Sequence, residues 1–225
     1  MAEGTLYIIG TPIGNIEDIT LRALKILKES INIIYCEDTR QSKKLLMAYD
    51  IHIPLRSLHA HSSPARIEEV CSELKKGNNI AYLTDSGTPA LSDPGSMLVR
   101  KAREYGIAII PLPGPSALAT IISVAGFPEK NIIFGGFLSK KPGKRIHELE
   151  KLREFPGIII IYESPYRIKK LLPALYQVFP GKEVLIGREM TKVYEEFISG
   201  TLTGEDAGLD SVKEKGEFTV AVFNN

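Results

Sequence analysis

The sequence predicts an α/β protein of two lobes, with a parallel sheet in the first lobe and a mixed sheet in the second. Short, nearly continuous apolar runs alternate with helical patterns in the first half, which is typical of strands covered on both faces. The second half adds strand-like segments without long helices between them, and this favours a mixed sheet. The stiff stretch Pro111–Pro115 separates the two patterns, so we expect lobes at 1–113 and 114–225.

The individual elements follow from apolar runs and from helix-start signals. The runs expected as strands in the first pattern are residues 6–9, 31–36, 80–83, 107–110 and 158–162. Two helices are expected at Ser63-Pro64 and Ser164-Pro165, because serine caps a helix and proline fits its first turn. Three more strand-like segments complete the second lobe: 184–187, 193–199 and 217–223.

Composition sets limits on the class of protein. The 225 residues, 44% of them apolar, suffice for one large domain or two lobes of about 110 residues each. A net charge of +1 neither suggests nor excludes a nucleic-acid partner. The uncharged stretch 106–127 carries prolines that would break a membrane helix, and the N-terminus shows no signal peptide. Cys36 and Cys71 lie in apolar segments and read as buried, reduced thiols, so we expect a cytoplasmic protein without membrane or metal partners.

The loops that follow the expected strands are candidate ligand sites, because open α/β sheets bind ligands there. In the first loop, Gly10, Gly14 and the later Asp38 suggest a dinucleotide fingerprint, but Pro12 occupies the place of the second glycine. The loop 84–95 is long for a plain connection, and its small residues leave room for a ligand. A tight connection, with Ser92 or Asp93 capping the next helix, is the structural alternative.

Eight motifs in order resemble those of the bacterial ribosomal RNA small subunit methyltransferase I family, a branch of the tetrapyrrole methylase superfamily. They are GTPIGN with EDIT, CEDTR, TDSGTPALSDPG, PGPSA, FGGFL, YESPYR, REMTK with YEE, and KGEF, and they span nearly the whole chain. The resemblance implies a homodimer that binds S-adenosylmethionine in the cleft between its lobes. It also implies methylation of the 2′-oxygen of a cytidine in 16S rRNA, within the small ribosomal subunit.

The resemblance places cofactor-binding residues in both halves of the chain. In the first half they are Thr11, Pro12, Asp85, Gly87 and Thr88. Those that follow the hinge are Ser116, Ala117, Tyr162, Met190 and Thr219. Asp85 offers a carboxylate to the positive centres of the ligand, with a purely structural cap as the alternative.

The acceptor and the RNA require other residues. A ribose hydroxyl is a poor nucleophile, so positioning and a nearby charged group would assist the transfer, and we assign this acceptor-side catalytic work to Asp38 and Arg40. A solvated surface ion pair is the alternative interpretation. Phosphate contacts are assigned to a basic loop, for which a solvated helix face is the alternative: Lys140, Lys141, Lys144 and Arg145. His59 and His61 form an HxH pair without a third ligand, so no metal site is expected.

The sequence leaves two alternative functions open, and it departs from the family pattern at its C-terminal end. A small-molecule tetrapyrrole methylase of the same fold would need a large trough for the macrocycle, and a non-catalytic ribosome-binding module would not bind the cofactor. Family members typically continue for several dozen residues with a basic segment, whereas this chain ends soon after KGEFTVAVF. A naturally short form and a shortened chain are both compatible with this, and RNA affinity is the property that would differ.

Overall fold

The computed structural model describes residues 3–59, 62–91, 95–204 and 212–225. The chain divides into two compact units, Met1–Ser116 and Ala117–Asn225. This division falls just after the Pro- and Gly-rich stretch, a few residues beyond the boundary expected after residue 113.

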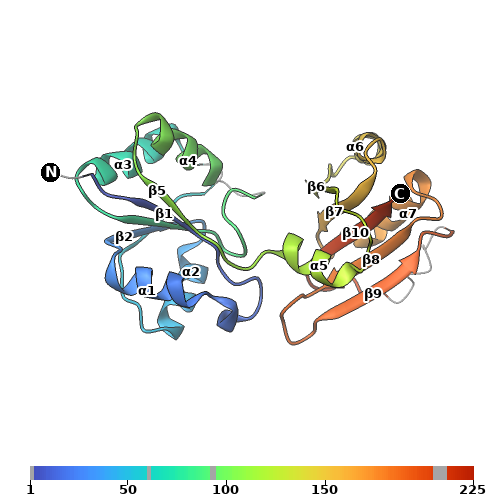
Figure 1. Ribbon diagram of the computed structural model, residues 1–225, viewed down its shortest axis with the longest axis horizontal. Helices are drawn as coiled ribbons and strands as arrows, with labels where there is room; N and C mark the ends of the chain where they lie inside the picture. The colour runs from blue at the N-terminus through green and yellow to red at the C-terminus, as the bar shows by residue number, and fades with distance from the viewer. Residues whose placement is uncertain (1–2, 60–61, 92–94, 205–211) are drawn as a thin grey trace. The chain divides into compact units, whose positions relative to one another are not determined.

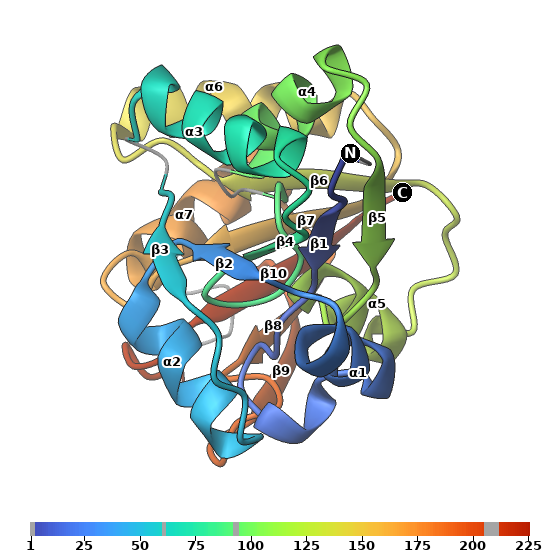
Figure 2. The same cartoon turned by 90° about the vertical axis from the view of Figure 1, so that its left-hand side faces the viewer.

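Unit 1 is built on a five-stranded parallel sheet with the order β3-β2-β4-β1-β5 (Figure 2). The strands are β1 Leu6–Ile9, β2 Ile33–Cys36, β3 Leu55–Ser57, β4 Ile80–Leu83 and β5 Ile109–Leu112. The predicted parallel sheet is confirmed, but β3 was not expected, because its sequence LRS is not an apolar run. Strand β5 lies two residues later than predicted and contains Pro111, which an edge strand tolerates because one side of its backbone has no partner strand.

Helices cover both faces of this sheet. Helices α1 (Leu21–Glu29) and α2 (Thr39–Ala48) lie on one face, and α3 (Pro64–Lys75) and α4 (Gly95–Glu104) lie on the other (Figure 1). Side chains of β4 alternate between these layers, so that Tyr82 packs with α3 and α4 while Leu83 packs with α1 and α2. This burial on both faces explains why the strands read as continuous apolar runs.

The helix-start signals were partly informative. Helix α3 begins at Pro64 as expected, although Ser63 makes no side-chain capping bond. Helix α7 (Ile168–Val178) does not begin at Ser164-Pro165, because Pro165–Arg167 form a turn in which the Ser164 carbonyl accepts from Ile168 N–H. That start was predicted wrongly.

Unit 2 contains a mixed sheet with the order β6-β7-β10-β8-β9, in which β6 is parallel to β7 and the other pairs are antiparallel. The strands are β6 Ile132–Phe137, β7 Gly157–Glu163, β8 Glu183–Arg188, β9 Glu196–Thr201 and β10 Phe218–Asn224. The predicted mixed sheet is confirmed. Strand β6 was missed, since its register shifts between Phe134 and Gly136 and interrupts the expected pattern.

The helices of unit 2 lie on opposite faces of its sheet (Figure 1). Helices α6 (Pro142–Arg153) and α7 pack on the face that carries Val220 and Val222. Helix α5 (Ala117–Ala125) lies over the other face, where Phe127, just beyond it, stacks on Phe223. The uncharged stretch 106–127 is therefore a strand, a turn and a short helix, as predicted. Across the ranges described above, no helix combines the length and apolar character needed to cross a membrane.

Candidate active site

The loops after β1 and β4 are joined by a backbone bridge in unit 1. Thr11 N–H donates to the Gly87 carbonyl at 2.9 Å, and Gly87 N–H donates to the Thr11 carbonyl at 3.1 Å. The Thr11 hydroxyl adds a bond to the Thr84 carbonyl at 3.2 Å, and Thr11 is buried. Thr11 thus supports the loop that carries Asp85, and its direct contact with a cofactor stays a prediction.

Gly87 is required at this bridge for conformational reasons. Its φ of +83° lies in the left-handed region that side chains other than glycine disfavour. A Cβ there would also lie 3.4 Å from Ile13 Cγ2. Beside it, Thr88 is exposed, and its hydroxyl lies 3.5 Å from the Pro115 carbonyl, so the loop after β5 joins the same cluster.

The loops after β1 and β5 also touch through two glycines. A Cβ on Gly114 would lie 2.7 Å from the Gly10 carbonyl oxygen, and one on Gly10 would lie 2.9 Å from Gly114 Cα. The two backbones are therefore in direct contact. Two predicted cofactor residues follow these glycines: Pro12 lies two residues after Gly10, and Ser116 lies two residues after Gly114 at the end of unit 1. Both are half-buried.

Asp85 and Asp38 meet because β4 and β2 are neighbours and their carboxyl ends share one edge of the sheet. Asp38 N–H donates to Asp85 Oδ1 at 3.0 Å. Asp85 is exposed, so its carboxylate is accessible to a ligand. The sequence placed these two acids in separate loops, and the strand order brings them together.

Asp38 caps helix α2 and pairs with Arg40. Its Oδ1 accepts from Arg40 N–H at 2.8 Å, and its Oδ2 accepts from Arg40 Nη2 at 2.6 Å. These side-chain and backbone hydrogen bonds from Arg40 lower the pKa of Asp38 to about 2. Asp38 is thus an anion at neutral pH and a poor proton acceptor, whereas 87% of the Arg40 side chain is exposed.

The low pKa of Asp38 gives a testable pH dependence. Since the folded-state pKa is depressed, the cap and ion pair are present above the ordinary carboxyl pKa and are lost as pH falls through about 2. A carboxyl titration followed by NMR should therefore give a midpoint of about 2 for Asp38. Arg40→Met should move this midpoint upward, and an unchanged midpoint would show that Arg40 is not the cause.

Three of the predicted cofactor residues of unit 2, Tyr162, Met190 and Thr219, lie on one face of its sheet. Thr219 of β10 pairs in register with Tyr162 of β7 and with Gly187 of β8, so all three share a face. A Cβ on Gly187 would lie 2.6 Å from Met190 Sδ and 2.9 Å from Ile121 Cδ1 of α5. Met190, itself buried, therefore packs over the glycine in this row.

Tyr162 also ties this face to the start of α5. Its hydroxyl oxygen accepts from Leu118 N–H at 3.0 Å, one residue beyond Ala117. Its ring packs edge-on against Phe134 and Phe137, with centroid distances of 4.9 and 5.7 Å. The start of α5, with Ala117, is thus held beside Tyr162, and the binding of a cofactor by these two residues stays a prediction.

The charged residues on either side of Met190 in REMTK are paired. Glu189 and Thr191 both have positive φ, 49° and 66°, which is strained for residues with side chains. Lys192 Nζ binds Glu189 Oε1 at 2.9 Å and Glu217 Oε2 at 2.8 Å. Burial raises the pKa of Glu189, but hydrogen bonds from Lys192 and from Glu217 N–H outweigh it and leave the pKa below its usual value.

The motif YESPYR contains a buried ion pair that sequence reasoning did not identify. The Glu163 side chain is fully buried and accepts from Ser164 N–H at 2.8 Å and from Arg167 Nη2 at 2.9 Å. Arg167 Nη2 also donates to the Leu138 carbonyl at 2.7 Å and so connects YESPYR to FGGFL. The i,i+4 spacing of the two charges was the available signal.

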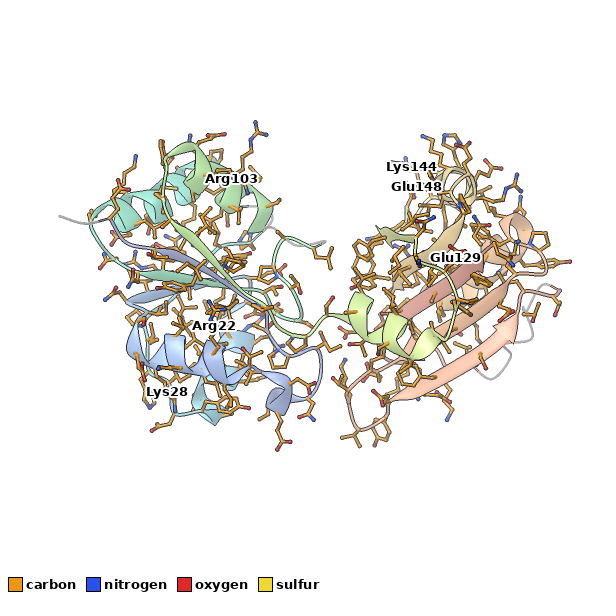
Figure 3. The ribbon with its side chains drawn as sticks, in the orientation of Figure 1. Arg22, Lys28, Arg103, Glu129, Lys144 and Glu148 are labelled. Atoms are coloured by element: carbon orange, nitrogen blue, oxygen red, sulfur yellow. The ribbon has the colours of Figure 1, made fainter. Side chains whose placement is uncertain are left out.

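The basic loop is only partly available to RNA. Lys140 and Lys141 are exposed, and Lys144 is 68% exposed beside Glu148 on α6, at 3.9 Å (Figure 3). Arg145 is only 5% exposed, because the first turn of α6 directs it inward. This corrects the expectation that Arg145 contacts phosphate.

Some expectations fall outside the described residues, namely those on His61, Ser92 and Asp93. Within the described ranges, no group of histidine, cysteine and acidic side chains is arranged to hold a metal ion. Cys36 and Cys71 are buried free thiols, as predicted. The cofactor cleft expected between the lobes stays a prediction.

Comparison with known proteins decides the family. The family model for tetrapyrrole (corrin/porphyrin) methylases matches residues 5–204. The chain belongs to the tetrapyrrole methylase family. This methylase is therefore an S-adenosylmethionine-dependent methyltransferase, and the predicted fold class and resemblance are confirmed.

Relatives of this methylase include proteins named ribosomal RNA small subunit methyltransferase I. One from Leptospira biflexa is 44% identical, and the match covers 96% of this chain and 89% of the relative. One from Borrelia garinii is also 44% identical, over 96% of this chain and 97% of the relative. The match to the Bacillus subtilis relative, 40% identical over 97% of this chain, covers 75% of that protein, so the relatives differ in length.

Solved structures with the same fold include methyltransferases of tetrapyrrole synthesis. A cobalt precorrin-4 methyltransferase superposes with a TM-score of 0.71 at 16% identity, over 96% of this chain and 94% of that chain. A uroporphyrin-III C-methyltransferase from Thermus thermophilus, in complex with S-adenosylhomocysteine, gives 0.65 at 16% identity over 97% of each chain. At 16% identity, the similarity between the methylase and these structures shows a shared fold only.

Proposed function

We propose that this methyltransferase transfers the methyl group of S-adenosylmethionine to the ribose 2′-oxygen of a cytidine in 16S rRNA, cytidine 1402 in the usual rRNA numbering. The observation that carries the proposal is the 44% identity, over 96% of the chain, to relatives named for methylation of small-subunit rRNA. The solved tetrapyrrole methyltransferases share only 16% identity and support the fold.

The loop cluster of unit 1 fits the polar part of the cofactor. S-adenosylmethionine supplies a methyl group already activated by its sulfonium. The exposed Asp85 carboxylate can accept hydrogen bonds from the ammonium or ribose hydroxyls of such a ligand, and exposed Thr88 adds a hydroxyl beside it. Gly87, Thr11 and Pro12 shape the loop backbone that presents these groups.

The face of unit 2 supplies contacts of a second kind. Met190 offers a polarisable thioether that is suited to an aromatic base, held in place over Gly187. Tyr162 and Thr219, side by side on neighbouring strands, add hydroxyl groups, and Ala117 leaves space next to Tyr162. We propose that these residues, together with Ser116, contribute to cofactor binding.

Asp38 and Arg40 act on the RNA side of the reaction. In the transfer a bond forms between the ribose 2′-oxygen and the methyl carbon, the S–C bond breaks to leave S-adenosylhomocysteine, and the hydroxyl proton passes to water. Asp38, with a pKa of about 2, does not serve well as the acceptor of that proton. We assign it the positioning of Arg40, whose exposed guanidinium is available to a phosphate of the RNA.

The proposal also covers the RNA contacts, the cellular location and the oligomeric state of the enzyme. Exposed Lys140, Lys141 and Lys144 are available for further phosphate contacts. The protein acts on 16S rRNA or the small ribosomal subunit in the cytoplasm, as a homodimer.

The proposal predicts the loss of one methyl mark from rRNA. In cells that lack this protein, mapping of 2′-O-methylation should show one cytidine of 16S rRNA unmodified, and the intact gene should restore it. Purified protein with labelled S-adenosylmethionine should methylate small subunits from the deficient cells but not those from wild-type cells. An unchanged methylation map would contradict the rRNA substrate and would favour a tetrapyrrole acceptor. Calorimetry without cofactor binding would instead indicate a non-catalytic module.

A further inference from the structure

A pocket of about 420 Å³ lies in unit 1 beside Arg40, between helix α2 and the segment that leads into β3. Apolar side chains make up much of its lining: Leu46, Met47, Ile51, Ile53 and Leu55. Met47 is 62% exposed, so its side chain is accessible to a ligand in this pocket. The volume lies within the range of small-ligand sites.

Basic groups from two elements border this apolar lining. Arg40 and Lys43 come from α2, and His52 comes from the segment after it. Arg40 is paired with Asp38, and His52 lies 2.8 Å from Asp50. Lys43 is exposed and has no ionic partner among the residues that the structure describes, so it is the uncompensated cation at the pocket.

Arg40 links this pocket to the loop cluster. It lines the pocket and is held by Asp38, whose N–H donates to Asp85. A ligand in the pocket would therefore lie next to the residues assigned to the acceptor side. An apolar surface with an adjacent cation is what an unstacked nucleotide requires, since its base needs an apolar contact and its phosphate needs a positive charge.

We propose that this pocket binds a nucleotide of the RNA adjacent to the one that is methylated. Its base lies against Met47 and Ile53, and its phosphate contacts Lys43 and Arg40. This inference rests on the proposed function and adds to it the subsite that selects an unpaired RNA segment. Met47 also supplies a sulfur atom that favours contact with an aromatic ring.

Lys43→Glu and its neighbour Lys44→Glu form a matched test. Both lysines are exposed on α2 and the charge change is identical, but Lys44 does not line the pocket and instead donates to Gln41. With small subunits as substrate, Lys43→Glu should raise KM by about tenfold or more with kcat retained, the scale of a lost charge-assisted hydrogen bond. Lys44→Glu should change KM by less than about twofold. Affinity for S-adenosylmethionine should be unchanged in both.

Met47→Ser provides a second, uncharged variant, since an exposed residue can change without loss of the fold. Met47→Ser should raise KM several-fold. It should also weaken the binding of a short single-stranded RNA, measured by fluorescence anisotropy. If the two lysine variants have equal effects and Met47→Ser leaves the enzyme unaltered, the pocket does not bind a nucleotide. The proposed rRNA function would not be affected by that result. A wild-type protein that binds the cofactor but methylates no rRNA would overturn the proposed function, and this inference with it.

Discussion

Asp85→Asn is expected to weaken the binding of S-adenosylmethionine by about tenfold or more, with the fold unchanged. The substitution removes the charge but keeps the oxygen that accepts from Asp38 N–H, so the contact between the two loops is retained. A lost hydrogen bond from a cationic or hydroxyl group to a carboxylate has this magnitude. Isothermal calorimetry measures the affinity, and a thermal melt shows that the protein remains folded.

Asp18→Asn is the matched control for this prediction. Asp18 is an exposed acid of unit 1 in the short helix η1 (Ile16–Asp18), and it undergoes the same change of charge. Cofactor affinity should not change in this variant. Asp85→Ala, which also removes the acceptor for Asp38 N–H, should be at least as weak a binder as Asp85→Asn. Wild-type affinity in both Asp85 variants would show that the cofactor is held elsewhere.

Glu163→Gln is expected to lower the free energy of unfolding of unit 2 by about 3 kcal/mol, because it leaves Arg167 mostly buried without its counter-charge. For a unit of this size, such a loss corresponds to a fall in Tm of roughly 10 °C. Scanning calorimetry measures both quantities. The cause is desolvation of the guanidinium, since glutamine keeps an oxygen that can accept one hydrogen bond.

Lys169→Met on α7 separates burial from simple loss of an ion pair. Lys169 and Glu214 lie 3.1 Å apart, but they are 60% and 48% exposed. An exposed pair contributes little, so Tm should stay within about 2 °C of the wild type. If Glu163→Gln is equally mild, the buried pair does not stabilise unit 2.

The positions of the buried strands along the chain were predictable because burial on both faces leaves a direct record in the sequence. Runs such as IAYL of β4 are apolar at every position, since alternate side chains enter different cores. Strand β3 and the bulged β6 left no such record, because LRS is half-exposed and FGGF contains a register shift. Helix starts were harder to predict from the sequence, because a Ser-Pro pair is found in turns as well as at helix caps. Ser164-Pro165 forms such a turn.

The sequence by itself determined the fold class and family, because eight ordered motifs and the apolar periodicity are properties of the chain in one dimension. Only the tertiary structure decided which charges are available for chemistry. It buried Arg145 and Glu163, brought Asp38 to Asp85, and placed Lys43 at a pocket. The reason is that exposure and pairing depend on strand order and helix orientation, and neither a charge nor its neighbours in the sequence specify these.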